Sequence, residues 1–276
     1  MGSPMDDISC GKEVLPIPAT DASFEPFEYV TKNIIPTPLA TPYYDGCTCL
    51  HSCSSSASST ETECGCLLAH GAAYDRNRLT DRLTHPHAIY ECNTRCTCPP
   101  TCANRLVQTG VTLPLQVFRT AGRGWGVRVQ DRVARGAFVV EYVGEVVGTR
   151  EAGRRWRGRR ARGNYLLCLR EHAETMIYRT NIDPTRKGNV ARFINHSCAP
   201  NLVVVPVRVD TMIPSAALFA ACDIEAGSEL TFHYGGEGGA VQDEGAGAGE
   251  EGGDRIPCVC GSEACCGYLP FDAGLE

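Results

Sequence analysis

The chain lacks a long apolar run and a recognisable leader. None of its segments approaches the roughly 20 consecutive apolar residues that cross a bilayer. The opening residues MGSPMDDISC have neither the basic nor the apolar part of a secretory signal, and Asp6 stands where a myristoylation signal carries Ser or Thr. These absences argue against secretion, a membrane span and a lipid anchor, and we expect a soluble intracellular protein.

The chain has fewer basic than acidic residues, 26 against 32, so its formal net charge is −6. Residues 235–254 carry six acids and no base, so the remaining sequence is neutral. This Gly-rich segment has few apolar residues to bury and is predicted to be a flexible loop, as is the serine-rich segment 54–63. Residues 150–162, in contrast, contain seven arginines. They indicate a solvated helix face, which charge alone favours, a nuclear-import signal, or a surface for acidic partners.

The distribution of apolar residues predicts a small, mainly β fold. The 29 glycines and 17 prolines separate short segments rich in β-branched and aromatic side chains. The predicted strands are 115–119, 126–129, 137–143, 165–169, 177–182 and 202–209. The only predicted helix begins at Thr149. The GRGWG motif at 122–126 precedes a strand and opens no helix, so it does not indicate a dinucleotide-binding site.

Cysteine is abundant, with 17 residues. In a reducing compartment cysteines are metal ligands more often than disulfide partners. Nine of the cysteines form an array in residues 47–102, three form an array near the C-terminus, and Cys198 is assigned below to the second array. Those outside both arrays, which we expect to be ordinary thiols, are Cys10, Cys168, Cys222 and Cys266.

The first array consists of Cys47, Cys49, Cys53, Cys64, Cys66, Cys92, Cys96, Cys98 and Cys102. Zinc takes four tetrahedral ligands, so nine thiolates serve three zinc ions if three of the sulfurs each bridge two ions. Cys-x-Cys spacing suits such a cluster, because residues two apart on an extended chain address neighbouring ions. The alternatives are a disulfide knot, which requires secretion, and a DNA-binding zinc-cluster module. Such a module usually has six cysteines and a following basic, heptad-bearing segment that this sequence lacks.

The second array contains Cys258, Cys260 and Cys265, one ligand fewer than a closed structural zinc site requires. Cys198, in the run RFINHSCAP, is the predicted fourth ligand, and His196 or Cys266 can substitute for it. The zinc ion would tie the C-terminal tail across the core. We therefore expect the tail to be ordered only when zinc is bound.

Taken in order, several motifs resemble one family. The nine-cysteine array, AGRGWGVRV, FVVEYVGEVV, KGNVARFINHSCAPN, ELTFHYG and CVCGSEACCGYL are similar to the pre-SET, SET and post-SET regions of histone-lysine methyltransferases. The segments DISCGKEVLPIPATD and PFEYVTKNIIP resemble the lead-in of the suppressor-of-variegation class, and the short chain looks most like the plant group related to that class. The resemblance implies a SET fold, in which small curved β-sheets surround a pseudoknot. It divides the chain into a lead-in (1–46), a pre-SET domain (47–110), a SET catalytic domain (111–235), an acidic loop (236–254) and a post-SET tail (255–276).

The resemblance also implies two cofactors, S-adenosylmethionine as methyl donor and zinc, with three ions in the pre-SET cluster and one in the post-SET site. The cofactor-binding residues that it implies are Arg123, Gly124, Trp125, Tyr165, Asn195, His196 and Tyr234. For catalysis it places Tyr234 beside the methyl-transfer axis and Tyr142 in the lysine channel. Phe232 matches the position that sets the number of methyl groups. Because a phenyl ring leaves room and anchors no water, di- or trimethylation is expected.

The roles of four residues are left open. Asn195 and His196 also fit a turn that only satisfies backbone groups. Arg192 fits a structural salt bridge as well as a ligand contact. His233 departs from the Asp usual at its position, and a pH effect near 6.5 is conceivable there.

The implied substrate is a histone tail or nucleosome, and lysine 9 of histone H3 is typical of the class. The arginine-rich segment 150–162 would meet nucleosomal DNA. The chain is expected in nuclear chromatin, without a membrane partner and as a monomer. A methyltransferase for non-histone proteins fits the same residues. An inactive chromatin-binding relative also accounts for the cysteines, but it makes intact Tyr142 and Tyr234 unnecessary.

Overall fold

The computed structural model describes residues 7–21, 23–36, 44–53, 64–80, 88–159, 165–172, 176–235 and 256–270. The serine-rich segment 54–63 and the predicted acidic loop 236–254 lie outside the described residues. Within the described ranges, no helix has both the length and the apolar character needed to cross a membrane.

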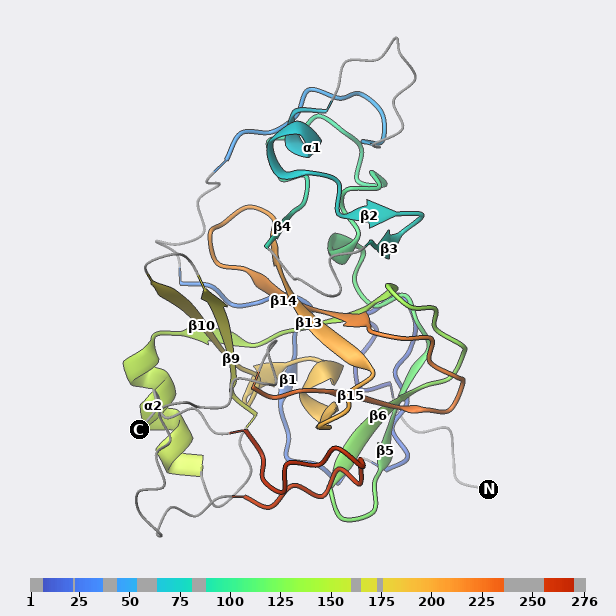
Figure 1. Cartoon of the computed structure of the whole chain (residues 1–276), viewed down its shortest axis with the longest axis vertical. Coiled ribbons are helices and arrows are strands. Elements are labelled where there is room, and N and C mark those ends of the chain that lie inside the picture. The colour runs from blue at the N-terminus through green and yellow to red at the C-terminus, as the bar shows by residue number, and fades with distance from the viewer. Residues whose placement is uncertain are drawn as a thin grey trace.

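Short strands make up most of the regular structure (Figure 1). In chain order the elements are β1 (Glu28–Tyr29), α1 (Gly65–His70), β2 (Tyr74–Asp75), β3 (Arg78–Leu79), β4 (Ile89–Tyr90), η3 (Val107–Thr109), β5 (Leu115–Arg119), β6 (Trp125–Val129), β7 (Phe138–Tyr142), β8 (Glu145–Val147), α2 (Thr149–Arg159), β9 (Leu167–His172), β10 (Ile177–Asp183), β11 (Lys187–Gly188), η4 (Val190–Phe193), β12 (Asn195–His196), β13 (Leu202–Arg208), β14 (Ser215–Ala220) and β15 (Glu229–Phe232). The predicted mainly β fold is confirmed.

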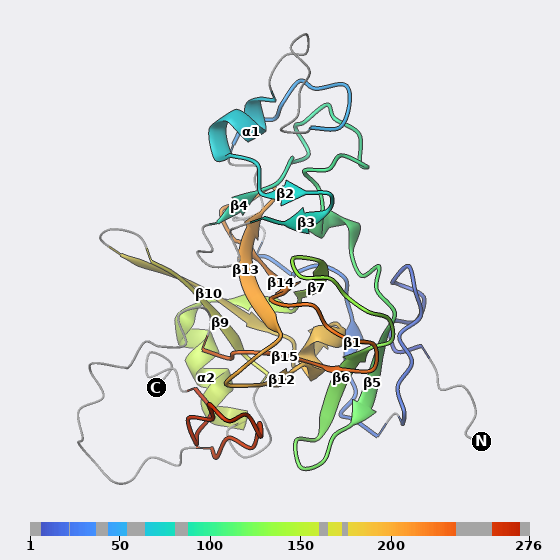
Figure 2. The same cartoon turned by 45° about the vertical axis from the view of Figure 1, so that its right-hand side comes forward.

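Two four-stranded sheets, β12-β15-β6-β5 and β4-β13-β14-β7, build the body of the molecule. The sheet β8-β10-β9 lies beside α2 (Figure 2), and β1-β11 and β2-β3 are two-stranded. The sheets share a core of close-packed aliphatic side chains, which excludes water and fixes their relative positions. In the first sheet, β12 runs parallel to β15, with Asn195 opposite Thr231. This pairing brings two motifs that are distant in sequence to the same place.

The predicted strands are present as β5, β6, β7, β9, β10 and β13, with small differences at their ends. The predicted helix is α2, which begins at Thr149. The sequence did not predict α1, β8, β14, β15 or the two-residue strands. The β14 sequence SAALFA is buried on both faces, so it lacks the polar–apolar alternation that marks a half-buried strand.

The lead-in segment is part of the core. Its strand β1 pairs in parallel with β11, and Ala19 and Ile34 form isolated bridges with Val117 and Glu145. Tyr29 of β1 is buried in the same core as these sheets. The lead-in is therefore packed against the sheets, and its residues line one of the cavities of the molecule.

Candidate active site

Four aromatic residues singled out in the sequence meet at one small cavity of ≈ 30 Å³, here called the channel. Tyr142 ends β7, Phe232 ends β15, and Tyr234 follows two residues later. The ring centroid of Phe232 lies 5.8 Å from that of Tyr142 and 4.9 Å from that of Tyr234. The complete lining is Tyr142, Tyr165, Leu166, Leu167, Arg192, Phe232 and Tyr234. The channel is small and mainly aromatic and apolar.

The hydroxyls of Tyr142 and Tyr234, two of the three tyrosines in the channel, donate to backbone carbonyls. Tyr142 donates to the carbonyl of Tyr165, and Tyr234 donates to the carbonyl of Ile194 at 3.0 Å. Burial raises the pKa of Tyr142 and that of Tyr234 well above the ordinary value. Both phenols therefore stay protonated at neutral pH and neither is a general base. Their oxygens remain free to accept, which suits the orientation of an amine.

The predicted pair Asn195 and His196 forms β12, beside Tyr234. The backbone N–H of Tyr234 donates to Nδ1 of His196 at 3.2 Å, and the two rings lie 5.3 Å apart. Burial, with a contribution from the charge of His233, lowers the pKa of His196 to about 4. The imidazole is thus neutral at pH 7, and its Nδ1 fixes the backbone of Tyr234.

An ion pair and two amide hydrogen bonds join the GRGWG loop to this pair. Arg123 Nη2 lies 2.6 Å from Glu229 Oε2. The side-chain amide of Asn195 donates to Glu229 Oε1 and to the Trp125 carbonyl, each at 2.9 Å. The structure thus brings together Arg123, Trp125 and Asn195, which the sequence proposed for one cofactor site.

The remaining loop residues pack against the lead-in. The ring of Trp125 lies edge-on to Phe24 at 5.4 Å, and the Arg119 guanidinium lies 4.2 Å from its centre. Gly124 has φ +72°, which glycine adopts without strain, and its carbonyl accepts from Thr120 N–H at 2.9 Å. The loop is a tight turn held by its own backbone.

Glu229 is a residue of this site that the sequence interpretation missed. It is the first residue of β15, and its two carboxylate oxygens bind Arg123 and Asn195 separately. Half-buried acids are uncommon without a partner, so an acid that opens the strand ELTF was an available signal.

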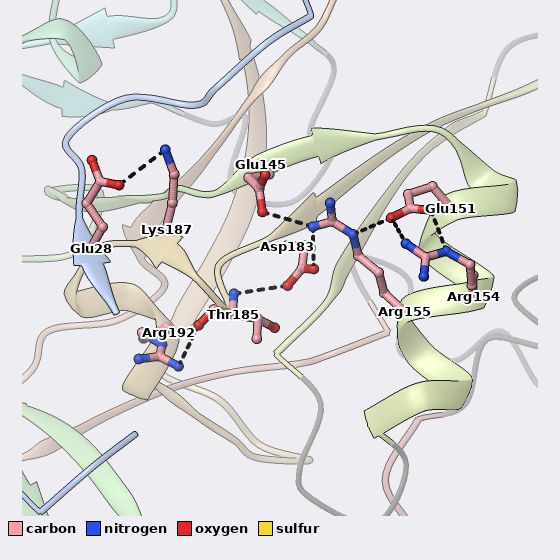
Figure 3. A network of polar contacts seen from close by, with 9 residues as sticks. All are labelled: Glu28, Glu145, Glu151, Arg154, Arg155, Asp183, Thr185, Lys187 and Arg192. Atoms are coloured by element: carbon pink, nitrogen blue, oxygen red, sulfur yellow. Dashed lines mark hydrogen bonds and ion pairs between the residues drawn. The ribbon is translucent and has the colours of Figure 1, made fainter. Parts of the chain in front are cut away.

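Arg192 is a buried cation at the channel. Its guanidinium lies 4.4 Å from the centre of the Tyr165 ring and 4.2 Å from that of Phe27. Nη2 donates to the carbonyl of Thr185 at 3.4 Å (Figure 3). The sequence left Arg192 open between a structural role and a ligand contact. The structure places its charge at the channel wall, with only 3% of the residue exposed.

The nine cysteines of the first array gather in one cluster. Overlapping groups of four have all their sulfurs within 4.8 Å of one another, and Cys47 and Cys92 each occur in three groups. The Sγ of Cys53 lies 3.7 Å from that of Cys47 and 3.8 Å from that of Cys92. A tetrahedron with Zn–S bonds of about 2.3 Å has an S···S edge of about 3.8 Å, whereas a disulfide needs about 2.0 Å. The cluster therefore fits shared zinc ions and contradicts the disulfide alternative.

A second sulfur group ties the tail to the core. The sulfurs of Cys198, Cys258, Cys260 and Cys265 all lie within 4.8 Å of one another, and Cys198 and Cys258 are 3.9 Å apart. The backbone N–H of Cys266 donates to Cys198 Sγ at 3.4 Å. His196 Nε2 lies 3.4 Å from the same sulfur. The tail therefore reaches the Asn195–His196 pair.

Comparison with known sequences agrees with this geometry. The SET domain family matches residues 124–235, and the Pre-SET motif family matches residues 9–105. The Bos taurus histone-lysine N-methyltransferase SETMAR is 38% identical over 283 residues, which covers 98% of this chain and 90% of that protein. The Homo sapiens protein of that name is longer, and this chain spans 40% of it. Xenopus tropicalis SUV39H2 is 42% identical over 215 residues, 75% of this chain and 51% of that protein.

Solved structures give the same result. The methyltransferase domain of human SETMAR superposes with a TM-score of 0.80 at 36% identity, covering 98% of this chain and 99% of that one. A complex of KRYPTONITE with DNA, an H3(1-15) peptide and SAH has a TM-score of 0.72 at 31% identity, covering 96% and 53%. The two predicted cofactors, the sulfonium methyl donor and zinc, agree with these findings and with the sulfur groups. The chain therefore belongs to the SET-domain histone-lysine N-methyltransferases, of the suppressor-of-variegation type.

Proposed function

We propose that this chain transfers methyl groups from S-adenosylmethionine to lysine 9 of histone H3 and forms the di- or trimethylated product. The observation that supports this most directly is the convergence of Tyr142, Phe232 and Tyr234 on one channel. The H3 peptide bound to KRYPTONITE, a relative of the same fold, supports the choice of substrate. Nuclear chromatin is the proposed location, and a monomer the proposed state.

The amine must be neutral before it attacks a methyl group. Free lysine has a pKa of about 10.4, so removal of its proton at pH 7 costs about 4–5 kcal/mol. The channel lowers this cost, because its walls are mainly apolar and the buried charge of Arg192 disfavours a second cation. The proton passes to water before transfer, and no protein base is required. The neutral amine would then be the nucleophile toward the methyl group that bound S-adenosylmethionine would supply.

S-adenosylmethionine supplies, when bound, a methyl group on a positively charged sulfur. The residues proposed to hold it are Arg123, Gly124, Trp125, Tyr165, Asn195, His196 and Tyr234. Glu229 keeps Arg123 and Asn195 in place. The oxygens of Tyr142 and Tyr234 accept from the amine and align its lone pair with the transfer axis. Alignment, rather than acid–base chemistry, is the main contribution of the protein.

Zinc has a structural role in this proposal. Three ions take the first array and one takes the second, through Cys47, Cys49, Cys53, Cys64, Cys66, Cys92, Cys96, Cys98, Cys102, Cys198, Cys258, Cys260 and Cys265. The proposed divisions remain a lead-in to residue 46, a pre-SET domain to 110, a SET domain to 235 and a post-SET tail from 255. In that arrangement the tail lies next to His196 and closes the cofactor site there.

The test is incubation of the zinc-loaded chain with radiolabelled donor and a panel of histones. We expect label in H3 only, and none when lysine 9 of H3 is replaced by arginine. Tyr234→Phe should lower kcat by about 100-fold or more, since it removes an aligning oxygen. Tyr178→Phe is the matched control, because Tyr178 is 54% exposed and does not line the channel. Label in no histone, or full activity of Tyr234→Phe, would refute the proposal.

A further inference from the structure

A second cavity, of ≈ 580 Å³, lies behind the strand that carries Tyr142. Glu141 lines this cavity, whereas Tyr142, the next residue of β7, lines the channel. Successive residues of a strand point to opposite faces, so one strand separates the two spaces. The other walls come from the lead-in, from residues 107–111 around η3, and from residues 209–215 between β13 and β14.

Glu141 provides the first acid of this cavity, and it is half-buried. Asn33 Nδ2 donates to its Oε1 at 2.9 Å, and Asn189 Nδ2 holds its backbone carbonyl at 2.8 Å. Burial raises the pKa of Glu141 to about 7 against the opposing effects of a hydrogen bond from Ser215 and the charge of Lys32, and the nearby charge of Glu91 also raises it. The raised pKa shows that the surroundings stabilise the negative charge poorly.

Glu13 provides the second acid, from the lead-in. The Tyr29 hydroxyl donates to its Oε1 at 2.9 Å, and the N–H of Val111 donates to its Oε2 at 3.4 Å. Burial raises the pKa of Glu13 as well. The carboxylates of Glu13 and Glu141 therefore lie where a positive charge is favourable.

The cavity supplies little of that positive charge itself. Among the ion pairs of the described residues, none includes Glu13 or Glu141. Lys12 and Lys32 line the cavity but are exposed, and the Lys12 ammonium donates to the Tyr29 carbonyl at 2.7 Å. Asp210, a third acid of the lining, accepts hydrogen bonds from Thr94. A half-buried acid that forms no ion pair favours a ligand that brings a cation into contact with it.

The rest of the wall is suited to a hydrocarbon spacer. Its apolar members are Val14, Ile35, Val107, Val111, Val209 and Ile213. A volume of ≈ 580 Å³ falls within the range of about 300–1,000 Å³ that small-molecule sites occupy. We propose that this cavity binds an aliphatic diamine or polyamine, with one ammonium group at Glu141 and another at Glu13.

Calorimetric titration of the zinc-loaded full chain at low salt tests this proposal. The probes are putrescine, cadaverine, hexamethylenediamine, hexylamine and hexanoate. One diamine should bind best, because its length matches the separation of the two carboxylates. Hexylamine should bind at least about tenfold more weakly than that diamine, and hexanoate should give no binding. Equal binding of hexanoate, or no diamine binding at millimolar concentration, would overturn the proposal.

Variants locate the site. Glu141→Gln and Glu13→Gln keep the size of the side chain, and each should weaken diamine binding at least about tenfold. Glu225→Gln is the control, since this exposed acid pairs with Arg132 and does not line the cavity. Unchanged diamine affinity in both cavity variants would also overturn the proposal. If circular dichroism shows that one variant is unfolded, the other variant and the comparison of probes still decide. The readout is binding, so the result does not depend on the proposed methyl transfer.

Discussion

At the scale of single residues, the channel depends on which polar groups its rings carry. Phe232 packs between Tyr142 and Tyr234 and has no hydroxyl, so it offers a methylated amine space and no fixed water. Arg192 is the one guanidinium among the residues of the lining. These two residues act on different properties, the number of methyl groups and the charge of the amine, and separate measurements can distinguish them.

Phe232→Tyr should change the product rather than abolish the reaction. The added hydroxyl would hold a water in the channel and crowd an amine that already carries a methyl group. We expect monomethyl-lysine to accumulate, with the first transfer slowed less than about tenfold. Mass spectrometry of an H3 peptide over time measures this. A variant that forms trimethyl-lysine as fast as the native chain would show that Phe232 does not control the product.

Replacement of Arg192 should move the pH profile of kcat. The reactive amine must be neutral, so kcat falls as pH drops below the pKa of the bound lysine. Loss of the buried cation raises that pKa, and the acid limb should move to higher pH by about one unit in Arg192→Met. Arg192→Lys keeps the charge and loses the contact of the planar guanidinium with the Tyr165 ring. Its kcat should therefore fall, while the acid limb of the pH profile stays close to that of the native chain. If the acid limb of kcat has the same pH midpoint in Arg192→Met and Arg192→Lys, Arg192 has a packing role alone.

At the scale of elements, Arg155 of α2 forms ion pairs with the sheet β8-β10-β9 (Figure 3). Arg155 Nη1 lies 2.9 Å from Glu145 Oε2 and 2.8 Å from Asp183 Oδ2, and its Nε lies 2.7 Å from Glu151. Although burial raises the pKa of Asp183, hydrogen bonds from Arg155 and Thr185 hold it below the ordinary value. The arginine-rich segment is thus only partly a solvated face, because Arg155 anchors the helix. Residues 160–162 of that segment lie outside the described residues.

Arg155→Met should destabilise the fold by roughly 1–3 kcal/mol, between the values for exposed and for buried ion pairs. The physical reason is that Asp183, with a side chain only 5% exposed, loses its partner. Arg154→Met is the matched control, because Arg154 pairs with Glu151 in solvent and should leave stability unchanged. Urea unfolding of the zinc-loaded proteins measures both. Equal midpoints for the two variants would contradict an anchoring role.

The elements that the sequence predicted are those with a local signal. Strand β13 is rich in valine, β5 contains a valine followed by an aromatic residue, and the predicted Cys198 follows from a ligand count. The missed features depend on distant partners. Glu229 pairs with Arg123 across 106 residues, and β14 has no alternation to reveal it. The second cavity was not predictable either, because its two acids lie on segments that only the folded chain brings together.

At the scale of the whole molecule, the sulfur groups connect segments that the sheets do not. The nine-cysteine cluster joins residues of the segments 47–53, 64–66 and 92–102 to one another. Strand β4, which precedes the last of these segments, pairs with β13. The second group joins Cys198 to a tail that the described sheets do not include. Loss of metal should therefore have different consequences at the two ends, since the first group supports a folded region and the second holds an arm over an existing core.

Single cysteine substitutions test that difference. Cys260→Ser should remove about one quarter of the bound zinc and most of the activity, while the melting temperature stays close to that of the native chain. Cys92→Ser should remove more zinc and lower the melting temperature. Cys92 is fully buried, and it belongs to three of the overlapping groups of four cysteines in the nine-cysteine cluster. Elemental analysis, circular dichroism and methyl transfer on the same samples give the three readouts. Equal zinc loss in both variants would argue against shared sulfurs, and full activity of Cys260→Ser would show that the tail is not needed to complete the site.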